Sequence, residues 1–594
     1  MPTVLHRLAK WSVESPDDIA QKFKVNGAWK SISAAQVCNQ VHFLALFLES
    51  RGITREIGTI FSYNCPQWVQ MELATLLLGA KSAGLYPNSN TKDIHYVLNH
   101  TETTFISIQN KEYFQKICGD MSFKLPDRIK LIIVFDGDTS FSPIAVSFDD
   151  AVAQGKRLSE KKESKNLSAY LGKLNPLEPS FLIYTSGTTG NPKGAMLSHD
   201  NLMYTSDIVS KYWKLPMSRG SLFSFLPLCH VAEKLQNVGV GISRHYTVHY
   251  CTKFENVATE LVEVQPTLLL CVPRLWEKMM EGVQKKIRTG KGLKKHLAKW
   301  ALGVGEKVAA DKYSGKAPNV FSVLQYKLAD YLVLNKIRHA LGLGKVELLA
   351  SGAAALGGYI SKWFRCIGLD ILEDFGQTES TGVICMTESG VESAGTVGKT
   401  VPGVEFKIAA DGEVLTRGRH VFLGYFKDPS ATAQTLENGW LHTGDLAKIN
   451  ERGLVQILGR KKEILKTSGG KMIAPLPIEE KLKQAEMISQ VCMVGDGRKY
   501  LSALITLTES VLEELKQKNS VKNGNTVSDP EVVASVKKYI DQINESLASY
   551  EQIKRFTILN KEFSIVDGEM TPTLKMKRNV IEKRYQDLIN NMYS

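Results

Sequence analysis

The sequence predicts an α/β protein with a large N-terminal domain of α/β subdomains on mainly parallel sheets and a small C-terminal α+β domain. Short apolar runs separated by helical patterns are typical of βαβ units, and they recur up to residue 352. Near residue 460 the chain becomes more charged and more helical, and the roughly 130 residues that follow are enough for a separate domain. We therefore expect domains at residues 1–460 and 461–594.

Six apolar runs are expected to form strands of the N-terminal domain, at residues 57–63, 104–109, 130–137, 181–184, 268–273 and 346–352. The apolar stretch 73–85 is interrupted by Lys81 and is too short to cross a bilayer, so we expect a buried helix there. In the C-terminal domain, residues 491–497 and 501–507 are strand-like, and the polar stretch 516–530 is expected to be an exposed loop.

The composition restricts the class of protein. Hydrophobic residues make up 43% and charged residues 23% of the 594 residues, which is ordinary for a globular protein with a sizeable core. The net charge of +13 fits either a solvated basic surface or attraction to polyanionic ligands or anionic membranes. Nucleic acid is not an expected partner, because the sequence has no zinc-finger, RNP-like or helix-turn-helix signature.

The cysteines and the N-terminus predict a cytoplasmic location. Nine scattered cysteines without a CxxC pair favour a reducing compartment, and the opening residues MPTVLHRLAKWS lack an apolar signal core. A basic segment at residues 285–300 is either a solvated helix over the core or an amphipathic contact with a membrane surface, so a peripheral location at a membrane stays open. Its basic residues are Lys285, Lys286, Arg288, Lys291, Lys294, Lys295 and Lys299.

A loop rich in Gly, Ser and Thr follows the expected strand at residues 181–184. Its sequence, TSGTTGNPKG, is weak evidence alone, although backbone N–H groups and hydroxyls of this kind can wrap phosphate oxygens. It is not a Walker A loop, because that pattern needs Lys directly after the last Gly, whereas Lys193 precedes Gly194. A second turn of small residues, SGAAALGG, ends the strand expected at 346–352, and ligands of open α/β sheets collect at such carboxyl ends.

Five motifs occur in a fixed order along almost the whole chain: TSGTTGNPKG, DFGQTES, LHTGDL, GRKKEILKTSGGK and GEMTPTLKMKR. Together they resemble the adenylate-forming (ANL) superfamily of acyl- and aryl-CoA synthetases, luciferases and peptide-synthetase adenylation domains. The stretches FLPLCHVAEK, VPRLWEKM and TPTLKMKR are further similar to long-chain fatty acyl-CoA synthetases of the bubblegum-type branch.

The resemblance implies an AMP-forming long-chain fatty acid–CoA ligase. Such an enzyme uses ATP and Mg²⁺ to convert a long-chain fatty acid to acyl-AMP and pyrophosphate, and then transfers the acyl group to coenzyme A with release of AMP. Because the fatty carboxylate must approach the α-phosphate of a polyanion, the site needs cations that offset the repulsion. In the family the C-terminal domain is mobile and takes one pose for each half-reaction.

The resemblance also assigns the phosphate, metal and nucleotide contacts. The loop from Thr185 to Lys193 surrounds the β- and γ-phosphates, and Glu379 holds Mg²⁺ with help from the hydroxyl of Thr185. The other implied nucleotide-binding positions are Ser186, Gly187, Thr188, Thr189, Gly190, Gly352, Ala353, Ala354, Asp374, Gly376, Gln377 and Thr378.

Five more residues receive individual roles from the resemblance. Phe375 lies against the adenine, with a core aromatic as the alternative interpretation. Asp445 accepts hydrogen bonds from the ribose hydroxyls, and Arg460 reaches ribose or phosphate. Lys575 is the expected catalytic lysine of adenylation, bridging the fatty carboxylate and the α-phosphate. His230 is expected near the carboxylate end of the acyl pocket, in gating or orientation, and a buried core histidine is the alternative.

The motif GRKKEILKTSGGK carries the residues implied for the second half-reaction. Lys462 aligns with the hinge of the mobile domain. Ser468, Gly469 and Gly470 line the path of the pantetheine arm, where backbone without Cβ suits a narrow tunnel.

One motif departs from the family pattern. SGAAALGG differs from the SGGAPL-like form common in the family, which leaves packing near the adenine undefined.

Two alternative functions remain open from the sequence. One is a fatty acyl-AMP ligase that loads a carrier protein, and the other is a non-catalytic lipid-binding relative. The second is disfavoured by the intact residues Lys193, Glu379, Asp445, Arg460 and Lys575. The sequence defines neither the preferred chain length nor the oligomeric state.

Overall fold

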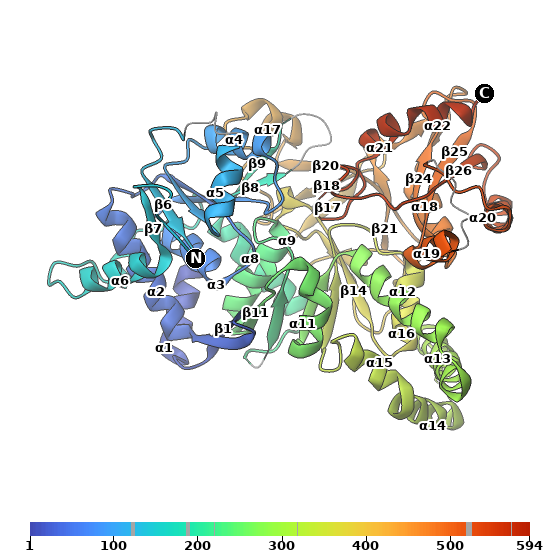
Figure 1. Ribbon diagram of the computed structural model, residues 1–594, viewed down its shortest axis with the longest axis horizontal. Helices are drawn as coiled ribbons and strands as arrows, with labels where there is room; N and C mark the ends of the chain where they lie inside the picture. Colours follow the sequence, from blue (N-terminus) through green and yellow to red (C-terminus); the bar gives the residue numbers. More distant parts are fainter. Residues whose placement is uncertain (120–124, 186–190, 219, 318, 518–524, 572) are drawn as a thin grey trace.

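The computed structural model describes residues 1–119, 125–185, 191–218, 220–317, 319–517, 525–571 and 573–594. Two large sheets carry most of the chain before residue 400, and a smaller antiparallel sheet follows (Figure 1). Residues 461–594, here called the C-terminal segment, lie on the side of the molecule opposite α1 (Val4–Glu14). The predicted class, α/β with mainly parallel sheets and an α+β unit at the C-terminal end, is confirmed.

The first large sheet has the strand order β7-β6-β5-β3-β4-β8-β9. Every neighbouring pair is parallel except β8 and β9, which form a hairpin in which Thr185 lies opposite Lys193. The strands are β3 (Ile57–Phe61), β4 (Lys81–Leu85), β5 (Phe105–Ile108), β6 (Leu131–Val134), β7 (Ala145–Ser147), β8 (Pro179–Thr185) and β9 (Lys193–Ser198). The hairpin therefore fixes both ends of the Gly-rich loop.

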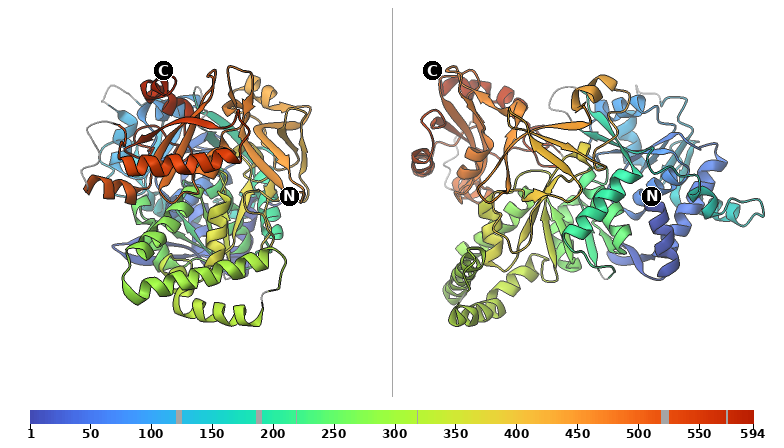
Figure 2. Two further views of the ribbon diagram at one scale, coloured as in Figure 1. Left: turned by 90° about the vertical axis from the view of Figure 1, so that its right-hand side faces the viewer. Right: turned by 180° about the vertical axis from the view of Figure 1, so that it is seen from behind.

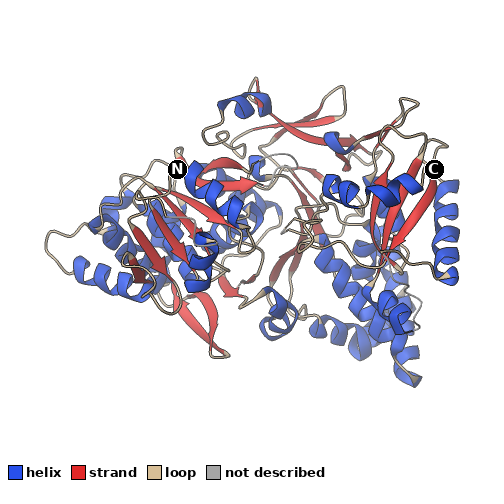
Figure 3. Ribbon diagram, turned by 45° about the horizontal axis from the view of Figure 1, so that its top comes forward, coloured by secondary structure: helices blue, strands red, loops and turns tan. Residues whose placement is uncertain are grey.

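Helices cover both faces of this sheet, as the continuous apolar runs require. Leu131 and Ile133 of β6 belong to the core on one face, whereas Ile132 and Val134 belong to a separate core on the other, because successive side chains of a strand alternate. The first face is covered by α2 (Ala34–Ser50), α3 (Pro66–Leu77) and α6 (Phe148–Ser159), and the second by α4 (Thr91–His100) and α5 (Lys111–Cys118). Figure 3 shows these strands between helices.

The buried helix predicted at residues 73–85 is wrong in its second half. Helix α3 ends at Leu77, Gly79 takes a left-handed backbone with φ of 72°, and the chain continues as β4. Glycine is the residue that adopts this conformation without strain, so it ends the helix. β4 then pairs in parallel with β3 and β8, so that an apolar run that looked like one helix supplies a central strand.

The second large sheet has the order β16-β15-β14-β13-β12-β10-β11-β1-β2 and is parallel from β14 to β1. Its strands are β1 (Ile19–Val25), β2 (Ala28–Ser33), β10 (Ser221–Ser224), β11 (Thr247–Tyr250), β12 (Leu268–Cys271), β13 (Leu348–Ser351), β14 (Ile371–Phe375), β15 (Cys385–Met386) and β16 (Lys399–Thr400). Gly352 and Gly376 directly follow β13 and β14, so the parallel register brings two of the predicted ligand loops to one edge.

Helices also enclose the second sheet. One side carries α8 (His199–Tyr212), α9 (Val231–Lys234), the π-helix η1 (Leu235–Gly241) and α10 (Ile242–Arg244). The other side carries α11 (Val257–Val264), α12 (Pro273–Thr289) and α16 (Gly358–Cys366). Short elements elsewhere are α7 (Leu167–Leu171) and the 3₁₀ turns η2 (Phe254–Asn256), η4 (Thr378–Ser380) and η5 (Lys461–Glu463).

A smaller antiparallel sheet joins the large sheets to the C-terminal segment. It contains β17 (Glu405–Ile408), β18 (Glu413–Arg417), β19 (Leu436–Glu437), β20 (Trp440–Ile449) and β21 (Val455–Arg460), with α17 (Pro429–Thr435) beside it. In the β20–β21 pair, Asp445 lies opposite Arg460. The last residue of β21 is thus also the last residue before the C-terminal segment.

The C-terminal segment has its own hydrophobic core around a mixed three-stranded sheet. Its strands are β22 (Leu465–Lys466), β23 (Met472–Ile473), β24 (Ile488–Val494), β25 (Leu501–Leu507) and β26 (Ile553–Leu559). Its helices are α18 (Leu476–Leu482), α19 (Glu509–Gln517), α20 (Pro530–Glu545), α21 (Arg578–Arg584) and α22 (Gln586–Asn591). Of the loop predicted at 516–530, residues 518–524 lie outside the described part of the chain.

A helical projection extends from the second large sheet (Figures 1 and 2). It consists of α13 (Gly292–Tyr313), α14 (Val320–Ala329), the π-helix η3 (Asp330–Leu334) and α15 (Asn335–Ala340). The basic segment predicted as one unit at 285–300 is divided, because α12 ends before Gly290 and α13 begins at Gly292. Among the described helices, none has the length and apolar character needed to cross a membrane.

Candidate active site

The β8–β9 hairpin places one cation at the end of the Gly-rich loop. The Thr185 hydroxyl donates to the carbonyl oxygen of Lys193 at 3.5 Å, and the Lys193 ammonium lies 5.0 Å from the centroid of the Tyr425 ring. The backbone of Tyr425 bridges to Ala195, which ties β9 to the 422–426 segment. The predicted contacts Ser186, Gly187, Thr188, Thr189 and Gly190 lie outside the described residues.

Glu379 reaches the same tyrosine from another element. It is buried in η4, and the Tyr425 hydroxyl donates to its Oε1 at 2.6 Å. Burial and the Glu379 carboxylate raise the pKa of Tyr425, so the phenol keeps its proton and acts as the donor. Tyr425 thereby joins Lys193 and Glu379, and the sequence analysis missed it, because no motif marks the stretch GYF in which it lies.

Asp374, at the end of β14, presents a buried carboxyl oxygen that lacks a hydrogen-bond partner among the described residues. Burial raises the pKa of Asp374 to about 7. A Cβ added to Gly352 would lie 2.7 Å from a carboxyl oxygen of Asp374, so only glycine permits this close approach. An unpartnered buried acceptor needs a donor, and the amino group of an adenine has the right chemistry.

The neighbouring nucleotide-motif residues have mixed surroundings. Phe375 is partly buried and packs against the hydrophobic cluster of the antiparallel sheet, which fits the core interpretation in part. A Cβ on Gly376 would lie 2.3 Å from the carbonyl oxygen of Gly382, so this position is also restricted to glycine. The side-chain amide of Gln377 donates to the carbonyl of Thr443 at 3.3 Å, and Thr378 is buried in η4.

In the SGAAALGG turn, the residue with a strained backbone conformation is an alanine. Ala353 has a φ of 70°, in the left-handed region where an L-residue with a Cβ is disfavoured, whereas the next residue, Ala354, is exposed. Such strain is held at ligand-binding loops in many proteins. Gly352 and Ala353 both line the pocket described below, so the strained residue belongs to the wall of the site.

Asp445 and Arg460 form an ion pair across β20 and β21, with Arg460 Nε 2.9 Å from Asp445 Oδ1. Burial raises the pKa of Asp445 to about 6, although the charges of Arg460 and Lys575 oppose the shift. Arg460 also donates to the carbonyl of Thr443 at 2.9 Å, the same acceptor that Gln377 uses. The antiparallel sheet is thus tied to the loop after β14.

The C-terminal segment brings Lys575 into this site. Lys575 lies in a tight hairpin in which Met570 pairs with Met576 and the Lys575 N–H donates to Thr571 Oγ1 at 3.0 Å. Burial and the positive charge of Arg460 lower the pKa of Lys575 to about 8, against the charges of Asp445 and Glu379. Leu574, beside it, packs against the core of the second large sheet, which inserts the hairpin into the N-terminal part.

His230 caps the start of α9, where the N–H of Ala232 donates to its Nδ1 at 3.3 Å. Burial and the nearby charge of Lys575 lower the pKa of His230 to about 3, so the imidazole is neutral near pH 7. A small pocket borders it, lined by Leu226, His230, Ala232, Leu270, Cys271, Val272, Gly352, Ala353 and Thr573. Thr573 belongs to the hairpin of Lys575, so both parts of the chain close this pocket.

The residues predicted for the thiol path are not gathered here. Ser468, Gly469 and Gly470 form an exposed turn between β22 and β23, and the Ser468 N–H donates to the carbonyl of Arg498 within the C-terminal segment. Lys462 is exposed in η5, directly after β21. In this structure the hairpin of Lys575, through Thr573, lines the pocket with His230, and the 468–470 turn does not.

The described residues contain no cluster of three or more His, Cys, Asp or Glu side chains that could hold a metal by themselves. Mg²⁺ is commonly bound by one or two carboxylates together with substrate phosphates and water, so the single buried carboxylate of Glu379 beside the phosphate hairpin fits such an ion. Lys193 on the β8–β9 hairpin, the unpartnered carboxyl oxygen of Asp374, the Asp445–Arg460 ion pair and the inserted lysine are together the features of an adenylate-forming enzyme.

The comparisons with known proteins assign the family. The chain belongs to the AMP-binding enzymes: residues 8–426 match the family described as AMP-binding enzyme, and residues 462–594 match the AMP-binding enzyme C-terminal domain. It is 32% identical over 589 residues to long-chain-fatty-acid–CoA ligase FadD15 of Mycobacterium bovis, covering 98% of this chain and 95% of that protein. It is 32% identical to long-chain-fatty-acid–CoA ligase ACSBG2 of Rattus norvegicus, covering 100% of this chain and 93% of that protein.

Solved structures agree on the fold. The anthranilate CoA ligase AuaEII in complex with anthranoyl-AMP is similar with a TM-score of 0.74 at 17% identity, covering 98% of this chain and 97% of that one. The adenylation domain of a carboxylate reductase from Mycobacterium chelonae has a TM-score of 0.75 at 19% identity, covering 100% of this chain and 91% of that one.

Proposed function

We propose that this site carries out both half-reactions of a long-chain fatty acid–CoA ligase, and that the structure corresponds to the first. The chain is an AMP-forming acid–thiol ligase of the family described above. The observation that carries the assignment of the half-reaction is the insertion of the Lys575 hairpin: Leu574 packs against the core of the second large sheet and Thr573 lines the pocket. There the charges of Arg460, Asp445 and Glu379 act on Lys575. The chain boundary at 460/461 then separates the body that binds ATP and fatty acid from the segment that delivers the lysine.

In the first half-reaction, the chain must hold a triphosphate and a carboxylate together. Lys193 and the loop before it bind the β- and γ-phosphates, while Asp374 accepts from the adenine amino group and Asp445 accepts from ribose. Glu379 and the Thr185 hydroxyl would hold Mg²⁺, which would supply positive charge against the phosphates. Lys575 bridges the fatty carboxylate and the α-phosphate as negative charge moves to the leaving pyrophosphate.

The protonation states suit these roles. With a pKa of about 8, most of the Lys575 side chains carry a proton near pH 7, and bound phosphate would stabilise the cation further. His230, with a pKa of about 3, stays neutral and cannot attract the fatty carboxylate by charge. We assign His230 to the wall of the acyl pocket, where it orients the carboxylate end.

The second half-reaction requires the hairpin of Lys575 to leave. Thr573 lines the pocket beside His230, so a thiol that attacks the acyl-AMP carbonyl needs this space. We propose that the C-terminal segment turns about Lys462 and that Ser468, Gly469 and Gly470 then line the path of the pantetheine arm. Ser468, Gly469 and Gly470 are exposed in this structure, so no packing would have to be broken for them to line that path.

Separate assays of the two half-reactions test the assignment of Lys575. Lys575→Ala is expected to lower pyrophosphate release from ATP and a long-chain fatty acid by at least about 100-fold, because a charge stabiliser is removed. Formation of acyl-CoA from added acyl-AMP and CoA is expected to continue. Lys577→Ala, in the same basic run, is the matched control and should retain both activities. Wild-type rates of adenylation in Lys575→Ala would show that the lysine is wrongly assigned.

We also propose a peripheral contact with a membrane surface, carried by the helical projection. Exposed apolar side chains occur on α14 and η3 at the spacing of one helical face: Val320, Phe321, Leu324, Leu328 and Tyr331, with exposures of 78%, 68%, 59%, 52% and 78%. Residues 281–340 carry thirteen Lys and Arg against four Asp and Glu. An apolar face within a basic surface favours an anionic bilayer.

Basic residues of α12 contact the C-terminal segment and are not part of the proposed membrane surface. Lys285 contacts Glu513 and Arg288 contacts Ser510, so the C-terminal segment occupies them. The proposed membrane surface is therefore the helical projection, with its apolar face on α14 and η3, and it does not include the basic residues of α12.

Sedimentation with vesicles tests this contact. The chain should bind phosphatidylcholine vesicles that contain phosphatidylglycerol better than phosphatidylcholine alone, and the triple variant Phe321→Ser, Leu324→Ser, Leu328→Ser should lose this binding. Leu177→Ser, at an exposed leucine outside the projection, is the control. Unchanged vesicle binding by the triple variant, or loss of a dimer instead of loss of vesicle binding, would contradict the proposal.

A further inference from the structure

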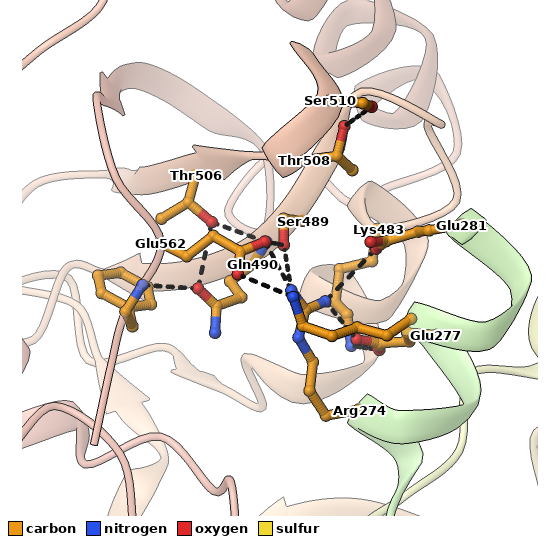
Figure 4. Close-up of polar contacts among 12 residues, drawn as sticks. Arg274, Glu277, Glu281, Lys483, Ser489, Gln490, Thr506, Thr508, Ser510 and Glu562 are labelled. Atoms are coloured by element: carbon orange, nitrogen blue, oxygen red, sulfur yellow. Dashed lines mark hydrogen bonds and ion pairs between the residues drawn. The ribbon is translucent and has the colours of Figure 1, made fainter. Parts of the chain in front are cut away.

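Buried charges join helix α12 to the C-terminal segment (Figure 4). Arg274, in the first turn of α12, is only 7% exposed. Its Nη2 donates to Glu562 Oε1 at 2.6 Å and to Ser489 Oγ at 2.8 Å, both in the C-terminal segment. Its Nη1 donates to Glu277 Oε2 at 2.8 Å on its own helix. One planar guanidinium thus holds two carboxylates, one from each part of the chain.

A second ion pair crosses the same interface, but here the C-terminal segment supplies the cation and α12 supplies the carboxylate. Lys483, which follows α18, lies 2.5 Å from Glu277 Oε1, and it also contacts Glu480. Although burial acts to raise it, the pKa of Glu277 is lowered by the charges of Lys483 and Arg274. The four side chains of Arg274, Glu277, Lys483 and Glu562, here called the interface cluster, therefore stay ionised.

The interface cluster is connected to both walls of the active-site pocket through neighbouring residues. On one side, Val272, two residues before Arg274, lines the pocket with His230. On the other side, the N–H of Phe563, next to Glu562, donates to the side chain of Gln490 at 2.7 Å, and Gln490 donates to the sulfur of Met570 at 3.3 Å. Met570 is the first residue of the hairpin that carries Lys575. A short chain of contacts therefore leads from Arg274 to that hairpin.

We propose that Arg274 is a positioning residue for adenylation: it docks the C-terminal segment in the orientation that inserts Lys575 into the site. This inference rests on the role of Lys575 given under the proposed function. Removing one partner of a buried charge pair leaves the other unpaired, so the docked arrangement should be strongly weakened without Arg274.

An ionic interface also suits a contact that must open. The interface cluster regains hydration when the segment withdraws, which offsets much of the lost attraction, whereas a large apolar interface would resist exposure. Ion pairs at the exposed rim are a different case. Lys285 and Glu513 join the same helix to the same segment at 2.8 Å, but their side chains are 49% and 51% exposed. Such an exposed pair contributes little to the stability of the docked arrangement. Lys285 therefore provides a matched control for Arg274.

The test compares Arg274→Met with Lys285→Met in the full chain. We expect Arg274→Met to lower acyl-AMP formation, followed as pyrophosphate release, by at least about 30-fold. Acyl-CoA formation from added acyl-AMP and CoA should stay within about threefold of wild type, since only the docking for adenylation is weakened. Lys285→Met should stay within about twofold in both assays. Arg274→Lys should restore part of the activity, because it keeps the charge but not the two-sided fork.

Three results would overturn the inference. They are an unchanged rate of acyl-AMP formation in Arg274→Met, an equal loss of both half-reactions with a lower melting temperature, and an equal effect of Lys285→Met. Hydrogen exchange gives a readout without substrate: the amides of residues 570, 571 and 573–576 should exchange faster in Arg274→Met than in Lys285→Met, and equal rates would count against docking.

The double variant separates this inference from the role of Lys575. If Arg274 acts through Lys575, Arg274→Met should add little to the loss already caused by Lys575→Ala, because the two effects are not additive. Full additivity would refute the positioning role. Normal adenylation in Lys575→Ala alone would instead refute the proposed role of the lysine, and the exchange experiment would still decide whether Arg274 docks the segment.

Discussion

The lowered pKa of Lys575 should make adenylation sensitive to pH between pH 7 and pH 9. Burial and Arg460 lower this pKa from the ordinary value of a lysine to about 8. The protonated ammonium is the active form, so the rate should be retained below the pKa and lost above it. From pH 7 to pH 9 the protonated fraction falls from about 91% to about 9%, which predicts a roughly tenfold fall in rate.

The assay is kcat/KM for ATP in pyrophosphate release, measured with a saturating fatty acid, because this parameter reports the free enzyme before bound phosphate raises the pKa. Lys575→Arg should remove the alkaline loss, since a guanidinium stays protonated throughout this range, even if its maximal rate is lower. Acyl-CoA formation from added acyl-AMP serves as the comparison. A profile that is flat from pH 7 to pH 9, or the same alkaline loss in Lys575→Arg, would refute the reasoning.

Two further predictions concern the site. Glu379→Gln should lower the rate of adenylation by about 100-fold and raise the Mg²⁺ concentration needed for half-maximal pyrophosphate release, and an unchanged Mg²⁺ dependence would argue against the metal role. Tyr425→Phe removes only a hydrogen-bond donor to Glu379, so it should lower the rate of adenylation by about tenfold. Ala353→Gly should raise the free energy of unfolding by up to about 1 kcal/mol in urea titrations, because the left-handed backbone no longer strains a Cβ, and a lower free energy would contradict the strain.

Much of the fold could be predicted from residue patterns. Apolar runs such as 104–109 and 130–137 became central parallel strands, because burial on both faces demands continuous apolar side chains. The stretch 73–85 was predicted wrongly as one helix, because a buried helix and a buried strand both have continuous apolar sequences. Gly79, which takes a left-handed backbone in the structure, separates the two elements. The pattern of charges predicts one basic segment at 285–300, whereas the break at Gly290 divides it between two helices with different contacts.

The site was only partly predictable. Motifs marked Glu379, Asp445 and Lys575, whose chemistry is carried by the residue type at a fixed place in a pattern. Tyr425 was missed, and Arg274 received no role although it stands in the stretch VPRLWEKM. Each acts through contacts with residues far away in the sequence: Tyr425 joins Lys193 to Glu379, and Arg274 joins its own helix to Glu562. Such contacts arise from the packing of one part of the chain against another, and a local pattern does not show them.

The central claim is that the chain activates long-chain fatty acids and passes them to coenzyme A. The most direct measurement is a series of carboxylic acids from acetate to long-chain fatty acids, scored for pyrophosphate, AMP and acyl-CoA with and without CoA. Long-chain acids should give equal amounts of AMP and acyl-CoA when CoA is present, and about one pyrophosphate per enzyme when it is absent, because acyl-AMP stays bound. Preference for acetate or aromatic acids, or AMP without acyl-CoA in the presence of CoA, would contradict it.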